Sequence, residues 1–87
     1  MYVILFYDMG EKRVGKALKI CRKYLTWVQN SVFEGEITEG SLKKLKYELN
    51  QKMDNDNDSI VLYAFDSMKY SMRETLGIEK NKHDIFL

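Results

Sequence analysis

The sequence has 87 residues, of which 45% are hydrophobic and none is proline, and its formal net charge is +1. These values predict one small globular domain over residues 1–87, and the near-neutral charge argues against a protein coated in positive potential. The single cysteine, Cys21, excludes an intrachain disulfide, so we expect a cytoplasmic location. The N-terminal apolar run is far shorter than the roughly 20 residues that cross a bilayer, so we expect no membrane association.

Residues 2–7 form an unbroken run of β-branched and aromatic residues that leads into a carboxylate, Asp8. Such a run predicts a strand that is covered on both faces. Asp8 then stands where the backbone leaves the sheet. A carboxylate at that point can cap the following helix or hold a metal ion.

The choice between these two roles for Asp8 depends on the number of ligands. Mg²⁺ commonly takes one or two carboxylates together with several waters, and one chain supplies a single carboxylate at this point. A two-fold homodimer would bring the same residue in twice. The residues by themselves favour a cap for the helix that begins near Glu11, and the metal site stays open as the alternative.

Small and apolar residues recur at spacings of three and four after the turn at residues 9–11, which predicts an amphipathic helix. The inner positions are Val14, Ala17, Leu18, Cys21 and Leu25. The opposite face carries a lysine stripe, which consists of Lys12, Lys16, Lys19 and Lys23 and is flanked by Arg13 and Arg22. The lysine stripe could contact nucleic-acid phosphates, or it could be an ordinary solvated helix face.

The next segments alternate between strand and helix patterns. Residues 27–37 are predicted to form a hairpin or a sharply bent strand pair, and Thr38 is expected to cap a second helix. The apolar side of that helix is Leu42, Leu45, Leu49 and Met53. Residues 60–65 are another continuous apolar strand. The order βαββαβ predicts an α+β, ferredoxin-like fold with two helices on one face of an antiparallel sheet and with the first and last strands together in the middle.

The acidic loop of residues 54–58 has the alternation D-x-D-x-D that opens a calcium loop. A calcium loop also needs Gly at its sixth position and Glu at its twelfth, where this chain has Ser59 and Phe65. The loop is therefore predicted to be a solvated turn between helix and strand.

Three segments together resemble the CRISPR-associated protein two family: residues 2–8, residues 25–35 (LTWVQNSVFEG) and residues 77–84 (GIEKNKHD). A strand that ends in Tyr-Asp is a weak motif, but VQNSVFEG at this distance from it is specific, and the resemblance covers nearly the whole chain. It implies the ferredoxin-like fold and a homodimer with sheets packed at the interface. In the tail of residues 66–87, a strand over residues 70–76 would extend the sheet of the partner.

The resemblance also implies a function. Members of this family take part in CRISPR adaptation, in which a dimer bridges the integrase, CRISPR-associated protein one, and holds a short duplex for insertion. Many are also described as metal-dependent endonucleases that act on RNA or double-stranded DNA. The central aspartate of the family matches Asp8, and two copies of it in the dimer can share one Mg²⁺.

The implied mechanism is metal-assisted phosphodiester hydrolysis, in which Mg²⁺ held by both Asp8 carboxylates polarises a phosphate oxygen and lowers the pKa of a bound water. Tyr7 adjoins the aspartate and is the second implied catalytic residue. Arg13 and Phe33 match positions that are expected to hold nucleic acid, together with the lysine stripe.

Trp27 and Glu11 stand at positions that are basic in many or some relatives, so this site would carry less positive charge. The lysine stripe and the sparse ligand set motivate an alternative function, a non-catalytic scaffold that binds duplex DNA and docks the integrase through its tail. A third interpretation is a generic RNA-binding module whose sheet stacks bases on aromatic residues, and the missing RNP-type signature argues against it.

Overall fold

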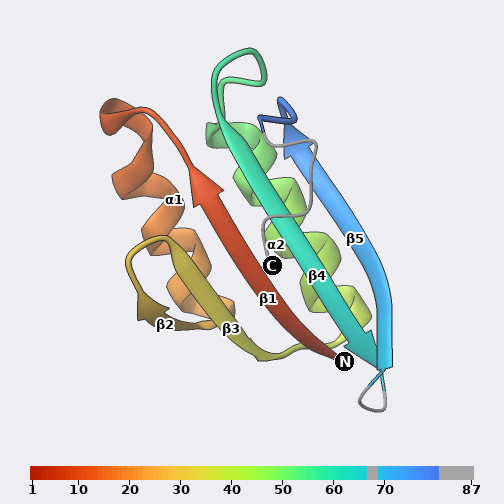
Figure 1. The fold of residues 1–87 in the computed structure, drawn as a ribbon. Helices are drawn as coiled ribbons and strands as arrows, with labels where there is room; N and C mark the ends of the chain where they lie inside the picture. Colours follow the sequence, from red (N-terminus) through yellow and green to blue (C-terminus); the bar gives the residue numbers. More distant parts are fainter. Residues whose placement is uncertain (67–68, 81–87) are drawn as a thin grey trace.

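The computed structural model describes residues 1–66 and 69–80, and only the backbone of residues 69–71. Within these residues, two helices lie on one side of a five-stranded antiparallel sheet (Figure 1). The elements in chain order are β1 (Tyr2–Asp8), α1 (Glu11–Tyr24), β2 (Thr26–Gln29), β3 (Val32–Glu36), α2 (Glu39–Lys52), β4 (Ser59–Asp66) and β5 (Lys69–Gly77). The predicted α+β, ferredoxin-like fold is confirmed.

The strand order is β2-β3-β1-β4-β5, so β1 lies in the middle and pairs with β3 on one side and β4 on the other. The first and last strands of the predicted βαββαβ unit, β1 and β4, are therefore neighbours, as expected. Their register places Leu5 opposite Leu62 and Asp8 opposite Ser59. On the outer edge of β4, Ser59 pairs in turn with Gly77 of β5.

In the tail that the sequence predicted over residues 66–87, Asp66 ends β4 and residues 69–77 form a further strand of the sheet. The strand β5 (Lys69–Gly77) pairs with β4 of its own chain, whereas the resemblance implied a strand that extends the sheet of a partner. The hairpin is favoured because pairing with the preceding strand closes only a short loop. Exchange of this strand between subunits stays a prediction, and residues 81–87 lie outside the described part of the chain.

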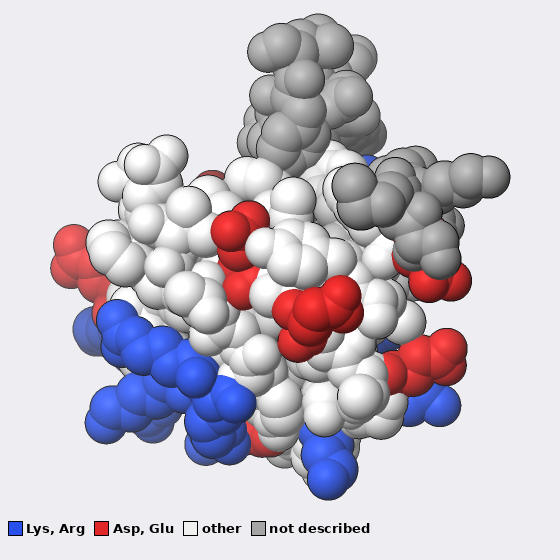
Figure 2. Space-filling view, turned by 90° about the horizontal axis from the view of Figure 1, so that it is seen from below, with Lys and Arg blue, Asp and Glu red and all other residues white. Residues whose placement is uncertain are grey.

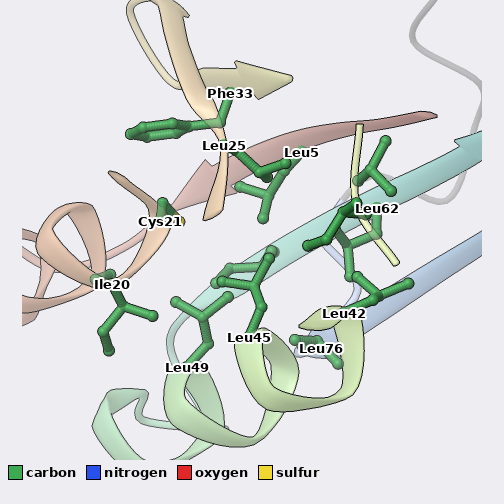
Figure 3. Close-up of a cluster of buried hydrophobic side chains, with 14 of the residues drawn as sticks. Leu5, Ile20, Cys21, Leu25, Phe33, Leu42, Leu45, Leu49, Leu62 and Leu76 are labelled. Carbon is green, nitrogen blue, oxygen red and sulfur yellow. The ribbon is translucent and has the colours of Figure 1, made fainter. Parts of the chain in front are cut away.

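The core lies between the helices and one face of the sheet, which we call the helix face (Figure 3). Successive side chains in a strand point to opposite faces, so alternate residues of the central strands are buried. These residues are Val3 and Leu5 of β1 and Ile60, Leu62 and Ala64 of β4. From α2 come Leu42, Leu45 and Leu49, which confirms the predicted apolar side of that helix. The predicted cap is also present, because the backbone N–H of Ser41 donates to Oγ1 of Thr38 at 3.1 Å.

The helix α1 turns a slightly different side inward from the one predicted. Ala17 and Cys21 are buried as expected, but Ile20 is buried too, and Val14 and Leu18 are half-buried. The buried side is shifted because α1 packs against α2 as well as against the strands. No helix in the described residues is long and apolar enough to span a membrane.

The second face of the sheet, which we call the open face, has no helix over it in the described chain. It carries Tyr2, Ile4, Phe6 and Asp8 of β1 and Val61, Tyr63 and Phe65 of β4. The prediction that residues 2–7 are covered on both faces is therefore wrong for this single chain, because both helices pack on the same side. Ile4 and Phe6 are half-buried, and the rings of Phe6 and Tyr63 meet edge to face at 6.1 Å.

Candidate functional site

Asp8 ends β1 on the open face, at the point where the chain leaves the sheet. Its side chain is 70% exposed, and its Oδ2 atom lies 3.3 Å from Nζ of Lys80. The same Nζ lies 3.5 Å from the backbone oxygen of Asp8. Asp8 thus offers a carboxylate oxygen and a carbonyl oxygen close together, and both are hard ligands of the kind that Mg²⁺ prefers.

Tyr7 does not share this site, because adjacent residues in a strand point to opposite faces. Its ring lies on the helix face, 6.1 Å from the ring of Phe33, and its hydroxyl donates to the backbone oxygen of Asn30 at 3.0 Å. Burial raises the pKa of the Tyr7 hydroxyl. The sequence predicted Tyr7 beside the Asp8 carboxylate, and the structure does not place it there. Instead, Tyr7 holds the turn between β2 and β3.

Phe33 was expected to contact nucleic acid, and its position in the fold contradicts this expectation. It lies in the middle of β3 opposite Leu5, and its exposed fraction is 0%. Figure 3 draws it as a member of the cluster of buried hydrophobic side chains. A side chain without exposed surface has a packing role, so Phe33 supports the β1–β3 pair rather than binding a ligand.

Asp58, which the sequence placed in a solvated loop, is instead fully buried. Its carboxylate accepts hydrogen bonds from Nε of Arg13 at 2.6 Å and from Nη2 of the same residue at 2.9 Å. It also accepts from the backbone N–H groups of Gly10 at 3.0 Å and Asp54 at 2.9 Å. Arg13 and these N–H groups hold the pKa of Asp58 well below its ordinary value.

This cluster, which we call the Asp58 node, has the role at the start of α1 that was predicted for Asp8. The helix α1 has Gly10 at its N-cap, and no side chain caps it from that position. The carboxylate that lies at its first turn comes from residue 58, in the loop before β4, and not from residue 8. The prediction that Asp8 caps α1 is therefore wrong, and the Asp8 carboxylate is left for another role.

Arg13 was predicted to contact nucleic acid, and in the structure its guanidinium is bound to Asp58. Its side chain is 32% exposed, so most of it is enclosed by the node. No sequence signal links the two residues, because they are 45 positions apart. The sequence offered only an indirect clue, which is the arginine in the first turn of α1. Once β1 and β4 pair, the N-terminus of that helix must lie beside the start of β4.

The lysine stripe lies on the outer side of α1, where Lys12, Lys16, Lys19 and Lys23 are all exposed. In Figure 2 Lys and Arg side chains gather at the lower left, on the helix side of the molecule. Lys23 forms an ion pair with Glu48 of α2, and this contact raises the pKa of Lys23. The outward charge of the stripe therefore lies mainly at Lys12, Lys16 and Lys19.

Asp8 and the lysine stripe lie on different sides of the sheet. Asp8 is on the open face, whereas α1 covers the helix face and turns its lysines away from it. At a rise of 1.5 Å per residue, Lys19 is about 12 Å along the helix from Glu11. The sequence predicted a metal site at Asp8 and a candidate phosphate-binding stripe on α1, and the fold places the two apart.

The ligand set of one chain is small. Within residues 1–66 and 69–80, no three His, Cys, Asp or Glu side chains form a group that could hold a metal ion. Asp8 fits Mg²⁺ as one carboxylate ligand, and a second copy of the chain or several waters would have to complete the coordination. The single Asp8 carboxylate therefore fits Mg²⁺ only as one half of a site that a two-fold symmetric dimer would complete.

The fold and this site define a class: a small ferredoxin-like protein with an exposed aspartate at the end of its central strand, on an open sheet face. A family model described as CRISPR associated protein Cas2 matches residues 1–73. The chain belongs to this family, and the resemblance seen in the sequence is confirmed.

Named relatives and solved structures agree with this assignment. A Thermotoga maritima protein named CRISPR-associated endoribonuclease Cas2 is 55% identical over 82 residues, which are 94% of both chains. A protein of the same name from Dictyoglomus turgidum is 48% identical over 87 residues, 100% of both chains. A crystal structure of cas2 has a TM-score of 0.75 and 33% identity, covering 100% of this chain and 98% of that chain. The crystal structure of Streptococcus pyogenes Cas2 at pH 6.5 has a TM-score of 0.69 and 35% identity, over 76% of this chain and 87% of that one.

Proposed function

We propose that this chain is a Mg²⁺-dependent endonuclease of CRISPR adaptation that acts as a homodimer on RNA or double-stranded DNA. The observation that carries the proposal is the exposed carboxylate of Asp8 at the end of the central strand. The fold assigns capping of α1 to Asp58, so the Asp8 carboxylate has no role in forming the helix. Relatives at 55% and 48% identity are named endoribonucleases, which supports the same chemistry here.

The open face supports a homodimer. Ile4, Phe6 and Val61 are half-buried in the single chain, and a second copy of the same surface would cover them. A two-fold interface is self-complementary, so it would also bring the second Asp8 to the same side. This pairing would supply the second carboxylate that the metal site lacks in one chain.

The residues of the chain then have separate tasks. When bound, Mg²⁺ supplies Lewis-acid chemistry, because it polarises a phosphate oxygen and lowers the pKa of a bound water. Asp8 would hold the ion through its carboxylate. The Asp58 node fixes the backbone that follows Asp8, because Gly10 and Arg13 both bind the buried carboxylate. Lys12, one residue into α1, is the member of the lysine stripe nearest in sequence to Asp8 and would attract the phosphate backbone.

The experiment compares cleavage of a labelled RNA and a labelled DNA duplex by the purified parent chain and by Asp8→Asn. The parent should cut with Mg²⁺ and stop in chelator. Asp8→Asn should lose more activity than the roughly 10- to 100-fold that loss of an outer-shell partner costs. The matched control is Asp66→Asn, which changes an exposed aspartate at the end of β4 and should cut like the parent. Equal cleavage by Asp8→Asn and the parent would show that the site is wrong.

A second candidate function is the non-catalytic scaffold that binds duplex DNA and docks the integrase. The separation of the lysine stripe from Asp8 favours it, because the exposed lysines of α1 could track a duplex without reaching the carboxylate. Binding should then fall steeply with salt. Replacing Lys12, Lys16 and Lys19 by Ala should lower the slope of log K against log salt by about 2 to 3.

The control for the salt-dependence experiment is a variant in which Lys43, Lys44 and Lys52 are replaced by Ala. It removes the same charge from α2. An equal loss of slope in both triple variants would mean that the stripe is not the binding surface. Removing residues 80–87 should abolish binding to the integrase if the tail is the docking segment, and retained binding would contradict this part.

A further inference from the structure

The contact between Asp8 and Lys80 joins the proposed metal ligand to the segment that follows β5. The Lys80 ammonium lies 3.3 Å from Oδ2 of Asp8 and 3.5 Å from its backbone oxygen. The side chain of Lys80 is 33% exposed, so it lies against the protein rather than extending into solvent. The two oxygens that this cation contacts, Oδ2 and the backbone oxygen, are among those that Asp8 offers to a metal ion.

The position of Lys80 follows from the sheet register. Asp8 is opposite Ser59, and Ser59 is opposite Gly77, so the ends of β1, β4 and β5 lie in one row. Neighbouring strands are about 4.8 Å apart, which places Gly77 about 10 Å from Asp8. The segment after β5 has to cross β4 to reach Asp8, and three residues span this distance. In Figure 1 this segment turns from the end of β5 toward β4.

The crossing segment is held at several points. Gly77 has φ +80°, a left-handed conformation that favours glycine, and the N–H of Ile78 donates to the backbone oxygen of Asp58 at 2.9 Å. The carboxylate of Glu79 accepts from Oγ1 of Thr75 at 2.7 Å and from Nη2 of Arg73 at 2.8 Å. The contacts of Ile78 and Glu79 therefore constrain the backbone that places Lys80 beside Asp8.

We propose that Lys80 is a tethered cation that occupies Asp8 in the metal-free protein and competes with Mg²⁺ for it. This inference rests on the proposed function, because it assumes that Asp8 is the metal ligand. The ammonium neutralises the carboxylate and contacts its Oδ2 atom and the backbone oxygen, so an ion that binds through these two oxygens must displace Lys80. Each bound Mg²⁺ therefore breaks one Asp8–Lys80 pair per contributing chain, and the pair lowers the affinity for the metal.

The direction of this effect separates competition from a merely structural role. If Lys80 only anchors the end of β5, its loss should leave metal binding unchanged or weaken it. If Lys80 competes, its loss should strengthen binding. Ion pairs between exposed groups are weak, so we expect a gain of about two- to fivefold in Mg²⁺ affinity rather than a larger one.

The test is calorimetric titration of the full chain with Mg²⁺ in the absence of nucleic acid. Lys80→Gln, which keeps a polar side chain one atom shorter and removes its charge, should lower the Kd by about two- to fivefold. Lys80→Arg keeps the charge and should bind like the parent. The matched control is Lys43→Gln on α2, which removes the same charge at the opposite end of the sheet and should leave the Kd unchanged.

The outcomes distinguish this inference from the function on which it rests. If the parent binds Mg²⁺ through Asp8, but Lys80→Gln binds no more tightly than Lys43→Gln, Lys80 is not a competitor and the proposed function stands. If Asp8→Asn binds Mg²⁺ as the parent does, Asp8 is not the ligand, and both proposals fail. A gain in affinity that appears in Lys80→Gln and disappears in Lys80→Arg would establish the competition.

Discussion

Two aspartates at the same corner of the sheet have opposite environments. Asp8 ends β1 on the open face with a side chain that is 70% exposed, and its carboxylate contacts Lys80. Asp58 immediately precedes Ser59, the residue that pairs with Asp8, yet it is 0% exposed and accepts four hydrogen bonds. Two aspartates at the same end of the paired strands β1 and β4 therefore have different roles.

The difference shows how the fold selects a ligand. A carboxylate that the chain has already surrounded with donors stabilises the fold and is unavailable to a metal ion. A carboxylate that the fold leaves at the edge of a sheet can bind one. If this comparison is correct, changes at Asp58 should act on stability and changes at Asp8 should act on metal binding and cleavage.

The largest effect on stability is expected for Asp58→Ala. It removes the partner of the Arg13 guanidinium and leaves the N–H groups of Gly10 and Asp54 without their acceptor, which should lower the free energy of unfolding by about 3 kcal/mol. Urea unfolding followed by circular dichroism measures the change. Asp56→Ala, an exposed aspartate in the same loop, should stay within about 0.5 kcal/mol of the parent. Equal effects of the two changes would refute the structural role of Asp58.

The next effect is expected at Gly77, where the backbone passes the Asp58 node. A Cβ atom at Gly77 would lie 2.2 Å from the backbone oxygen of Asp58, and its φ of +80° disfavours other residues. Gly77→Ala should therefore lower the free energy of unfolding by about 2 kcal/mol. Gly15→Ala, in the middle of α1 with nothing within 4 Å of the new Cβ, should instead raise it by about 0.5–1 kcal/mol. Thermal unfolding of both variants checks the opposite signs.

A smaller effect is expected in acid, where only part of the Asp58 contribution is lost. The folded-state pKa of Asp58 is lowered by Arg13, so its ionised form stabilises the fold at every pH above the unfolded value of about 3.9. This contribution is lost as the pH falls below about 4 and through the folded-state pKa. The parent should therefore lose more stability between pH 5 and pH 2.5 than Asp58→Asn does. Parallel pH profiles of urea unfolding for the two proteins would contradict the assignment.

The smallest effect on stability is expected for Asp8→Asn, because an exposed ion pair contributes little. Its free energy of unfolding should lie within about 0.5 kcal/mol of that of the parent. Mg²⁺ should raise the Tm of the parent, because an ion that binds the folded state stabilises it, and should leave the Tm of Asp8→Asn unchanged. A large loss of stability in Asp8→Asn without metal would place Asp8 with Asp58, as a structural residue.

Most of the fold could be predicted from local patterns. The apolar run of residues 2–7, the spacing of Ala17 and Cys21 and the Thr38 cap each depend on near neighbours in the chain, and the elements form where these patterns predict them. Asp8 could also be singled out, because its position at the end of a strand is a local property. Identifying the protein as a member of the Cas2 family needed only motifs that lie within short segments.

The roles of Tyr7, Phe33 and Arg13 could not be predicted in the same way. Tyr7 is next to Asp8 in sequence and on the opposite face in space, because successive strand residues alternate. Phe33 is an aromatic residue in a specific motif, and only the pairing of β3 with β1 shows that it belongs to the core. Arg13 has the charge of a phosphate ligand, and a residue 45 positions away determines that it binds Asp58 instead.

The sequence by itself determined the elements, their order and the aspartate at the end of the first strand, because these depend on periodicity and on local conformational preference. The tertiary structure decided which carboxylate is buried, which face of the sheet stays open and which lysine reaches Asp8. These properties depend on strand register and on contacts between distant segments, which no single stretch of the chain encodes. Asp8 and Asp58 could be told apart only after β1, β4 and β5 had been placed side by side.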